Sequence, residues 1–179
     1  AETIMKVNAL GTINITEAFY EVATEGFALV NVASMAAHLF PRWLIPRRAY
    51  PYAFSNKAVF LNKVLFLCRL MPNGLHRTGT AYAISKNFVI WYSKENAARF
   101  GQKGARILSV SPGMFDTEMG RLEEKSSSSE MLKESALKRF GKPEEVAELL
   151  AFCVSDKASY ITGADILCDG GVIASKVKF

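Results

Sequence analysis

The spacing of apolar residues in the first part of the chain predicts helices that alternate with buried strands. Apolar side chains recur every three or four positions over residues 2–23, which predicts an amphipathic helix that ends near Gly26. The run from Phe27 to Val32 is short, continuous and rich in branched side chains, as expected of a buried strand. A second long helix is predicted from Tyr82 to about Phe100, and a second buried strand from Ala105 to Val110. Helix followed by strand is typical of an α/β protein.

The C-terminal part repeats this alternation. Pro143 followed by two glutamates is a favourable helix start, because proline fits the first turn and acidic side chains interact well with the helix N-terminus. We expect this helix to run to about Val154. A last short strand is predicted from Asp165 to Cys168, closed by two glycines.

Two segments interrupt the alternation. Lys125 to Ser129 contains four consecutive serines and predicts a mobile loop, because serine side chains compete for backbone hydrogen bonds. Residues 38–80 are interpreted as an inserted, partly helical subdomain within a single domain that spans residues 1–179. Within the insertion, one broad apolar helical face is predicted from Val59, Phe60, Leu61, Val64, Leu65, Leu67, Cys68 and Met71.

Composition narrows the class of protein. The chain has 179 residues, of which 50% are hydrophobic and 22% charged, so it suits one globular domain and excludes a disordered chain. The three cysteines, Cys68, Cys153 and Cys168, are an odd number without metal-ligand spacing, which argues against a disulfide framework and a closed zinc site. This use of cysteine leads us to expect a reducing, cytoplasmic setting. No apolar run approaches the ~20 residues of a membrane-spanning helix, so we expect no membrane association.

The positive charge is local. The formal net charge is +5, and no acidic residue lies between Glu25 and Glu95, where nine lysines and arginines occur. These basic residues are interleaved with apolar ones and no recognised nucleic-acid-binding motif accompanies them, so nucleic acid is not an expected partner. The apolar face and the basic residues of the insertion, Arg47 and Arg48 among them, predict a surface that covers a hydrophobic substrate with an anionic tail. A subunit contact is the alternative.

Three features of the sequence carry candidate chemistry. Tyr82 and Lys86 are four residues apart, which places both on one helical face, where the ammonium favours the phenolate and suits the tyrosine to acid–base work. Ser34 follows the first predicted strand, at the sheet edge that faces the ligand crevice in open α/β sheets, and could hold a carbonyl oxygen. The turn at Pro112 and Gly113 ends the second strand in the same way. Separately, each has a simpler interpretation: a surface pair, a turn hydroxyl and a plain turn.

Together with further motifs, these residues resemble the short-chain dehydrogenase/reductase family. The motifs follow the family's order and cover the chain apart from the insertion: Val7-Asn8-Ala9-Leu10-Gly11, Asn31-Val32-Ala33-Ser34, Tyr82-Ala83-Ile84-Ser85-Lys86, Ser111-Pro112-Gly113, Arg139-Phe140-Gly141-Lys142-Pro143-Glu144-Glu145, Ile161-Thr162-Gly163 and Asp169-Gly170-Gly171. The resemblance implies an α/β, Rossmann-like, doubly wound parallel sheet that is present only in part. The family's N-terminal strands and its glycine-rich turn, which cradles the cofactor diphosphate, have no counterpart before Asn8. We therefore expect an additional N-terminal βαβ portion in the encoded protein.

The resemblance also implies a reaction and its residues. It implies an oxidoreductase that interconverts a secondary alcohol and a ketone with NAD or NADP. The implied catalytic residues are Asn8, Ser34, Tyr82 and Lys86. The implied cofactor-binding residues are Tyr82, Lys86, Pro112, Gly113, Phe115 and Thr117. No metal is implied.

Each implied catalytic residue has a stated role. Tyr82 would transfer the proton, Lys86 would assist it and hold the nicotinamide ribose, and Ser34 would stabilise the substrate oxygen. Asn8 would position a water in the proton relay, unless it only bonds to nearby backbone. An epimerase or dehydratase on the same fold, and an inactive fragment or non-catalytic family member that acts as a binding or assembly module, remain alternatives.

The insertion gives a more distant resemblance. Ser34 and Tyr82 are 48 positions apart (82 minus 34), more than is usual in the family. Extra helical residues at this point resemble the hydroxysteroid dehydrogenase/carbonyl reductase branch, which implies a hydrophobic carbonyl or alcohol substrate. The family also implies a homo-oligomer, a dimer or tetramer. The sequence offers no partner for His38 or His76, which are interpreted as solvated or interface residues.

Overall fold

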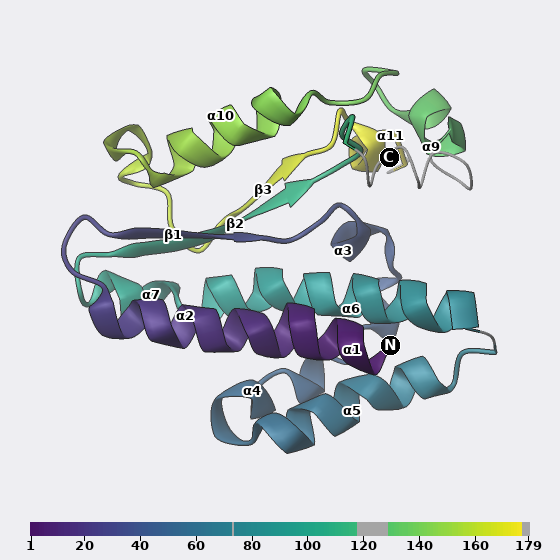
Figure 1. Cartoon of the computed structure of the whole chain (residues 1–179), viewed down its shortest axis with the longest axis horizontal. Coiled ribbons are helices and arrows are strands. Elements are labelled where there is room, and N and C mark those ends of the chain that lie inside the picture. Colours follow the sequence, from purple (N-terminus) through teal and green to yellow (C-terminus); the bar gives the residue numbers. More distant parts are fainter. Residues whose placement is uncertain (73, 118–128, 177–179) are drawn as a thin grey trace.

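The computed structural model describes residues 1–72, 74–117 and 129–176. Three parallel strands form its sheet in the order β1 (Ala28–Val32), β2 (Arg106–Pro112) and β3 (Asp165–Cys168) (Figure 1). Val30 pairs with Leu108, and Val110 pairs with Ile166. Parallel neighbours require long crossover connections, and helices supply them on both faces of the sheet. This confirms the α/β class and the part of a Rossmann-like sheet predicted from the sequence.

Helices cover both faces of the sheet, and α4 (Tyr52–Ser55) and α5 (Lys57–Arg69) lie beyond the helices on one side (Figure 1). α10 (Pro143–Val154) covers one face, where Leu108, Val110 and Cys153 are fully buried. The other face carries α6 (Gly74–Glu95), α7 (Ala97–Gly101) and the long N-terminal helix. That helix consists of α1 (Glu2–Met5), a π-helical turn η1 (Lys6–Leu10) and α2 (Gly11–Val22). β2 is buried without interruption from Ile107 to Ser111, because helices cover both faces of the sheet.

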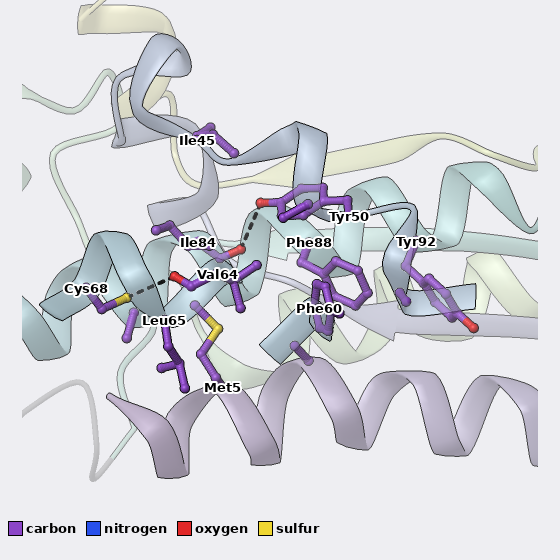
Figure 2. Packing of buried hydrophobic residues seen from close by; sticks show 14 of the residues in the cluster. Met5, Ile45, Tyr50, Phe60, Val64, Leu65, Cys68, Ile84, Phe88 and Tyr92 are labelled. Carbon is purple, nitrogen blue, oxygen red and sulfur yellow. Dashed lines mark hydrogen bonds between the residues drawn. The ribbon is translucent and has the colours of Figure 1, made fainter. Parts of the chain in front are cut away.

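The largest apolar cluster lies outside the sheet. It fills the space between α1, α6 and the pair α4 and α5, as Figure 2 shows. Its centre is aromatic: the rings of Phe60 and Phe88 lie 4.6 Å apart, and those of Tyr50 and Phe88 lie 5.2 Å apart. Burial of this kind stabilises the fold at roughly 25 cal/mol per Å² of apolar surface.

Residues 38–80 contribute directly to this cluster. The segment begins within the single turn α3 (Ala36–Leu39), contains η2 (Arg42–Leu44), η3 (Arg47–Ala49), α4 and α5, and ends within α6. The predicted apolar face of α5 exists, but its side chains pack against α1 and α6 within the chain. The prediction that this face covers a ligand or a second subunit is therefore wrong, because the chain's own helices already occupy it. Arg47 and Arg48 are exposed, and their attraction of an anionic group stays a prediction.

Most predicted boundaries agree with the structure. β3 and α10 have the predicted limits, and β1 and β2 differ from the prediction by one or two residues. α6 is the main exception, because it begins at Gly74, so Tyr82 lies in its third turn and not near its start. Lys125 and the first three serines of the predicted loop fall outside the described residues, and Ser129 is the first residue of α9 (Ser129–Glu134). α11 (Val172–Lys176) follows β3.

The described residues contain neither a candidate membrane-spanning helix nor a candidate metal site. In that part of the chain, no helix has both the length and the apolar character needed to cross a membrane. The same residues contain no group of three or more His, Cys, Asp or Glu side chains placed to hold a metal ion.

Candidate active site

The chain after β1 and the chain after β2 are joined at the carboxyl edge of the sheet. The N–H of Ala33 donates to the carbonyl of Val110 at 2.7 Å, and the N–H of Met35 donates to the carbonyl of Pro112 at 2.8 Å. These two bonds fix the backbone on either side of Ser34. A third bond, from Gly113 N–H to the Cys168 carbonyl at 2.8 Å, attaches the second loop to the end of β3.

α6 brings Tyr82 and Lys86 to the same edge. The Lys86 ammonium donates to the carbonyl of Val32, the last residue of β1, at 2.9 Å. It also lies 5.8 Å from the centre of the Tyr82 ring. The Tyr82 side chain is exposed, so its hydroxyl can reach a ligand. Partial burial disfavours the charged form of Lys86 and lowers its pKa.

Asn8 is tied to α6 through Ser85. Its amide Nδ2 donates to Ser85 Oγ at 3.0 Å, and Ser85 Oγ donates to the carbonyl of Tyr82 at 2.8 Å. Ser85 is completely buried. Asn8 lies within η1, where Gly11 N–H bonds to the Lys6 carbonyl and gives the wider spacing of a π turn. The side chain thus spans two helices and does not serve only the nearby backbone.

Ser34 occupies the turn between β1 and α3. Its hydroxyl oxygen accepts a hydrogen bond from Ala36 N–H at 3.2 Å, as a local turn hydroxyl does. Among the described residues, no hydrogen bond links Ser34 to Tyr82 or Lys86. The structure therefore places Ser34 at the sheet edge through the backbone bonds around it.

The segment after Gly113 turns toward the loop before α10. Phe115 forms a parallel bridge with Gly141, and a Cβ atom on Gly141 would lie 2.5 Å from the Phe115 ring. The backbone N–H of Thr117 donates to the Phe115 carbonyl at 2.8 Å. A small cavity of about 80 Å³ lies beside this contact, and none of the four implied catalytic residues lines it. Its lining includes Phe115, Gly141, Cys168 and Asp169.

His38 corrects the sequence interpretation. Its Nε2 atom lies 3.0 Å from Asp165 Oδ2 and 3.3 Å from Ser111 Oγ, so this histidine is neither solvated without partners nor an unassigned interface residue. Those partners are 127 and 73 positions away in the sequence, which no local pattern reveals. Sequence reasoning also missed Ser85 and Asp165, whose side chains bind Asn8 and His38, although Ser85 lies between Tyr82 and Lys86 in one of the family motifs.

Comparisons with known proteins identify the family and the fold of this chain. A family model described as enoyl-(acyl carrier protein) reductase matches residues 71–173. The short-chain dehydrogenase/reductase bsc3 of Alternaria brassicicola is 31% identical over 177 residues, which cover 97% of this chain and 63% of that protein. The 3-oxoacyl-[acyl-carrier-protein] reductase FabG of Thermotoga maritima is 39% identical over 94 residues, or 52% of this chain and 38% of that protein.

Solved structures show the same fold. The 3-alpha-hydroxysteroid dehydrogenase from Pseudomonas sp. B-0831, complexed with NADH, superposes with a TM-score of 0.77 at 24% identity, over 97% of this chain and 68% of that one. BdcA in complex with NADPH gives a TM-score of 0.67 at 23% identity, over 93% of this chain and 54% of that one.

The extent of these matches decides the family. The chain spans less than two thirds of the length of the two relatives named above. Within that span, the family model covers more than half of the chain and the Alternaria protein aligns with nearly all of it. This chain therefore belongs to the short-chain dehydrogenase/reductase family of oxidoreductases.

Proposed function

We propose that this chain carries the proton-transfer site of an NAD- or NADP-dependent oxidoreductase that interconverts a secondary alcohol and a ketone. One observation carries the proposal: Lys86 connects the end of β1 to the face of Tyr82, through a 2.9 Å bond to the Val32 carbonyl and a 5.8 Å approach to the ring. Ser34 lies two residues beyond Val32, so a substrate oxygen near Ser34 would also be near the tyrosine. The family and the cofactors of its solved neighbours support this assignment.

Each catalytic residue of the chain has a separate role in the reaction. The Tyr82 hydroxyl donates a proton to the ketone oxygen in reduction, and the Tyr82 phenolate accepts the proton of the alcohol in oxidation. Ser34 O–H stabilises the charge that builds up on the same oxygen. Asn8, held against Ser85, positions a water that returns a proton toward Lys86 and Tyr82.

Lys86 also fits a role toward a dinucleotide. An ammonium has three N–H donors, and the bond to Val32 uses one of them, so the others suit the hydroxyls of a ribose. Pro112, Gly113, Phe115 and Thr117 would hold the nicotinamide end. The dinucleotide, when bound, supplies or receives the hydride at the carbon next to the proton-transfer oxygen.

The test uses the protein expressed from its complete reading frame and a panel of ketones and secondary alcohols, some apolar and anionic and some neutral. Turnover is followed by nicotinamide absorbance. Tyr82→Phe removes only the transferable proton and is expected to lower kcat by about 10²–10⁴-fold with the dinucleotide affinity unchanged. Lys86→Ala should lower both kcat and dinucleotide affinity. Tyr160→Phe is the matched control, because Tyr160 is fully exposed at the end of η5 (Asp156–Ala158) and should retain normal turnover.

Two results contradict the proposal. Near-normal turnover of Tyr82→Phe, with a substrate whose chemical step limits the rate, would remove Tyr82 from the reaction. A Tyr82-dependent conversion with no net oxidation or reduction of the dinucleotide would indicate the epimerase or dehydratase alternative.

A further inference from the structure

One carboxylate at the start of β3 binds side chains from two other elements, β2 and α3. Asp165 accepts a hydrogen bond from Ser109 Oγ at 2.6 Å and from Ser111 Oγ at 2.9 Å, both on β2. His38 Nε2, on α3, lies 3.0 Å from Asp165 Oδ2. The Asp165 side chain is only 12% exposed, and both serines are completely buried. We call these four residues the Asp165 clamp; none of them takes part in the proposed proton transfer.

The donors of the clamp can be assigned from its chemistry. An ionised carboxylate only accepts hydrogen bonds, so the two serine hydroxyls must donate to Asp165. The hydrogen of His38 must then lie on Nε2, where it points to Asp165 and is also near Ser111 Oγ at 3.3 Å. Hydrogen bonds to an ionised acceptor are roughly twice as strong as neutral ones. The clamp is therefore a specific, charge-assisted attachment between α3 and the sheet.

α3 depends on such attachments. It has only four residues, Ala36–Leu39, and its N-cap residue Met35 makes no side-chain hydrogen bond to it. A single helical turn is unstable by itself, because its nucleation cost exceeds what one turn of hydrogen bonds returns. Contacts from outside hold it: Asn87 Nδ2 of α6 donates to the Ala37 carbonyl at 3.2 Å, and His38 reaches β2 and β3 through the clamp.

These contacts form a closed loop around Ser34. Ser34 is four residues before His38, and the backbone next to it is bonded to β2 by Met35 N–H and the Pro112 carbonyl at 2.8 Å. The neighbouring residue of β2 is Ser111, which binds Asp165, which in turn binds His38. A shift of His38 away from Asp165 would release the far end of the turn that carries Ser34.

We propose that His38 and Asp165 are positioning residues that hold Ser34 in reach of the substrate oxygen next to Tyr82. The inference rests on the proposed function, since it gives the clamp a role through Ser34. It adds that the reaction depends on two residues that do not touch substrate or cofactor. It also assigns a role to the polar pair Ser109 and Ser111, which are buried side chains of β2.

The test compares three variants of the protein expressed from its complete reading frame, with the best substrate from the panel above. His38→Ala removes the N–H that donates to Asp165. Asp165→Asn replaces the ionised carboxylate with an amide, whose two N–H groups face the three side chains that donate to Asp165. His38→Gln keeps an N–H at about the reach of Nε2. His76→Ala is the matched control, because it removes an exposed histidine at the start of α6.

The expected pattern separates positioning from general damage. His38→Ala and Asp165→Asn should lower kcat by about 10–100-fold, as small displacements of a reacting group do. The dissociation constant of the dinucleotide should change by less than about twofold, because the interaction lost acts on the chemical step. His38→Gln should recover most of the lost kcat, and His76→Ala should match the unchanged protein.

Three outcomes overturn the inference. The first is a normal kcat in His38→Ala. The second is a His38→Ala variant that binds the dinucleotide more weakly but keeps its kcat. The third is a His38→Gln variant with a kcat as low as that of His38→Ala. Tyr82→Phe, measured in parallel, separates the two proposals. If Tyr82→Phe is inactive while His38→Ala is normal, only the positioning role fails; if Tyr82→Phe is active, the proposed function itself fails.

Discussion

Substitution of Gly113 by alanine should destabilise the protein, because the new methyl group has no room at the end of the sheet. A Cβ atom there would lie 2.5 Å from Cα of Asp169 and 2.7 Å from its Cβ. Carbon atoms in contact prefer about 3.5–4.0 Å, so the two segments must separate by about 1 Å. Rotation of a side chain cannot provide this, because the closest atom belongs to the backbone.

Asp169 is also fixed from its other side. Its carboxylate accepts hydrogen bonds from Gly171 N–H at 2.9 Å and from Ile173 N–H at 2.8 Å, at the start of α11. Overpacking of a tight contact costs about 1–3 kcal/mol. Separation would also stretch the 2.8 Å bond from Gly113 N–H to the Cys168 carbonyl, worth about 1 kcal/mol. We therefore expect the free energy of unfolding to fall by about 2–4 kcal/mol.

Gly79→Ala should instead raise the free energy of unfolding. Gly79 lies inside α6, and a Cβ atom there would meet nothing within 4 Å. Alanine favours a helix interior over glycine by about 0.5–1 kcal/mol. Urea unfolding of both variants, followed by far-UV circular dichroism, gives the two signs. A Gly113→Ala variant as stable as the unchanged protein, or stabilised like Gly79→Ala, would refute the steric argument.

Two further predictions concern stability. Phe88→Ala should lower the free energy of unfolding by about 3–5 kcal/mol in the same urea assay, because Phe88 is completely buried among the rings of Tyr50, Phe60 and Tyr92. A decrease below about 1 kcal/mol would contradict the packing in Figure 2. Hydrogen bonds from Arg139, the larger cause, and from the Lys142 N–H lower the pKa of Glu145 from 4.5 to about 2. The stability that this carboxylate contributes is therefore complete above pH 4.5 and is lost as the pH falls toward 2. Glu145→Gln should remove that part of the acid dependence of the urea midpoint, and an identical acid profile in the variant would show that the ion pair contributes nothing.

Local sequence signals predicted the sheet well. β3 and α10 have the predicted limits because glycine or proline marks their ends and their apolar residues are continuous or periodic. The start of α6 could not be predicted, because residues 74–81 include two glycines and two threonines, which favour a helix weakly. These residues are helical because they extend α6, whose later turns are packed in the core.

The candidate site was predictable only where its residues form motifs. Tyr82 and Lys86 are four positions apart, so the sequence alone indicates that they share a face. The approach of Lys86 to Val32 spans 54 positions, and that of His38 to Asp165 spans 127. Such contacts depend on the order of strands in the sheet, which no local pattern states. The occupant of the apolar face of α5 was misjudged for the same reason, because amphipathicity identifies a buried face but not the element that buries it.

The π-helical turn η1 sets the rotational phase between the two halves of the first helix. Met5, Ala9 and Ile13 are all buried and are four positions apart. At 3.6 residues per turn, each step of four residues rotates about 40° beyond a full revolution, so these positions would drift off one line in a regular α-helix. The wider turn, closed by the bond from Gly11 N–H to the Lys6 carbonyl, absorbs the excess. This stretch is therefore constrained in residue count as well as residue type: insertion of one further residue in η1 would rotate α1 by about 100° against α2 and turn either Met5 or Ile13 out of the core.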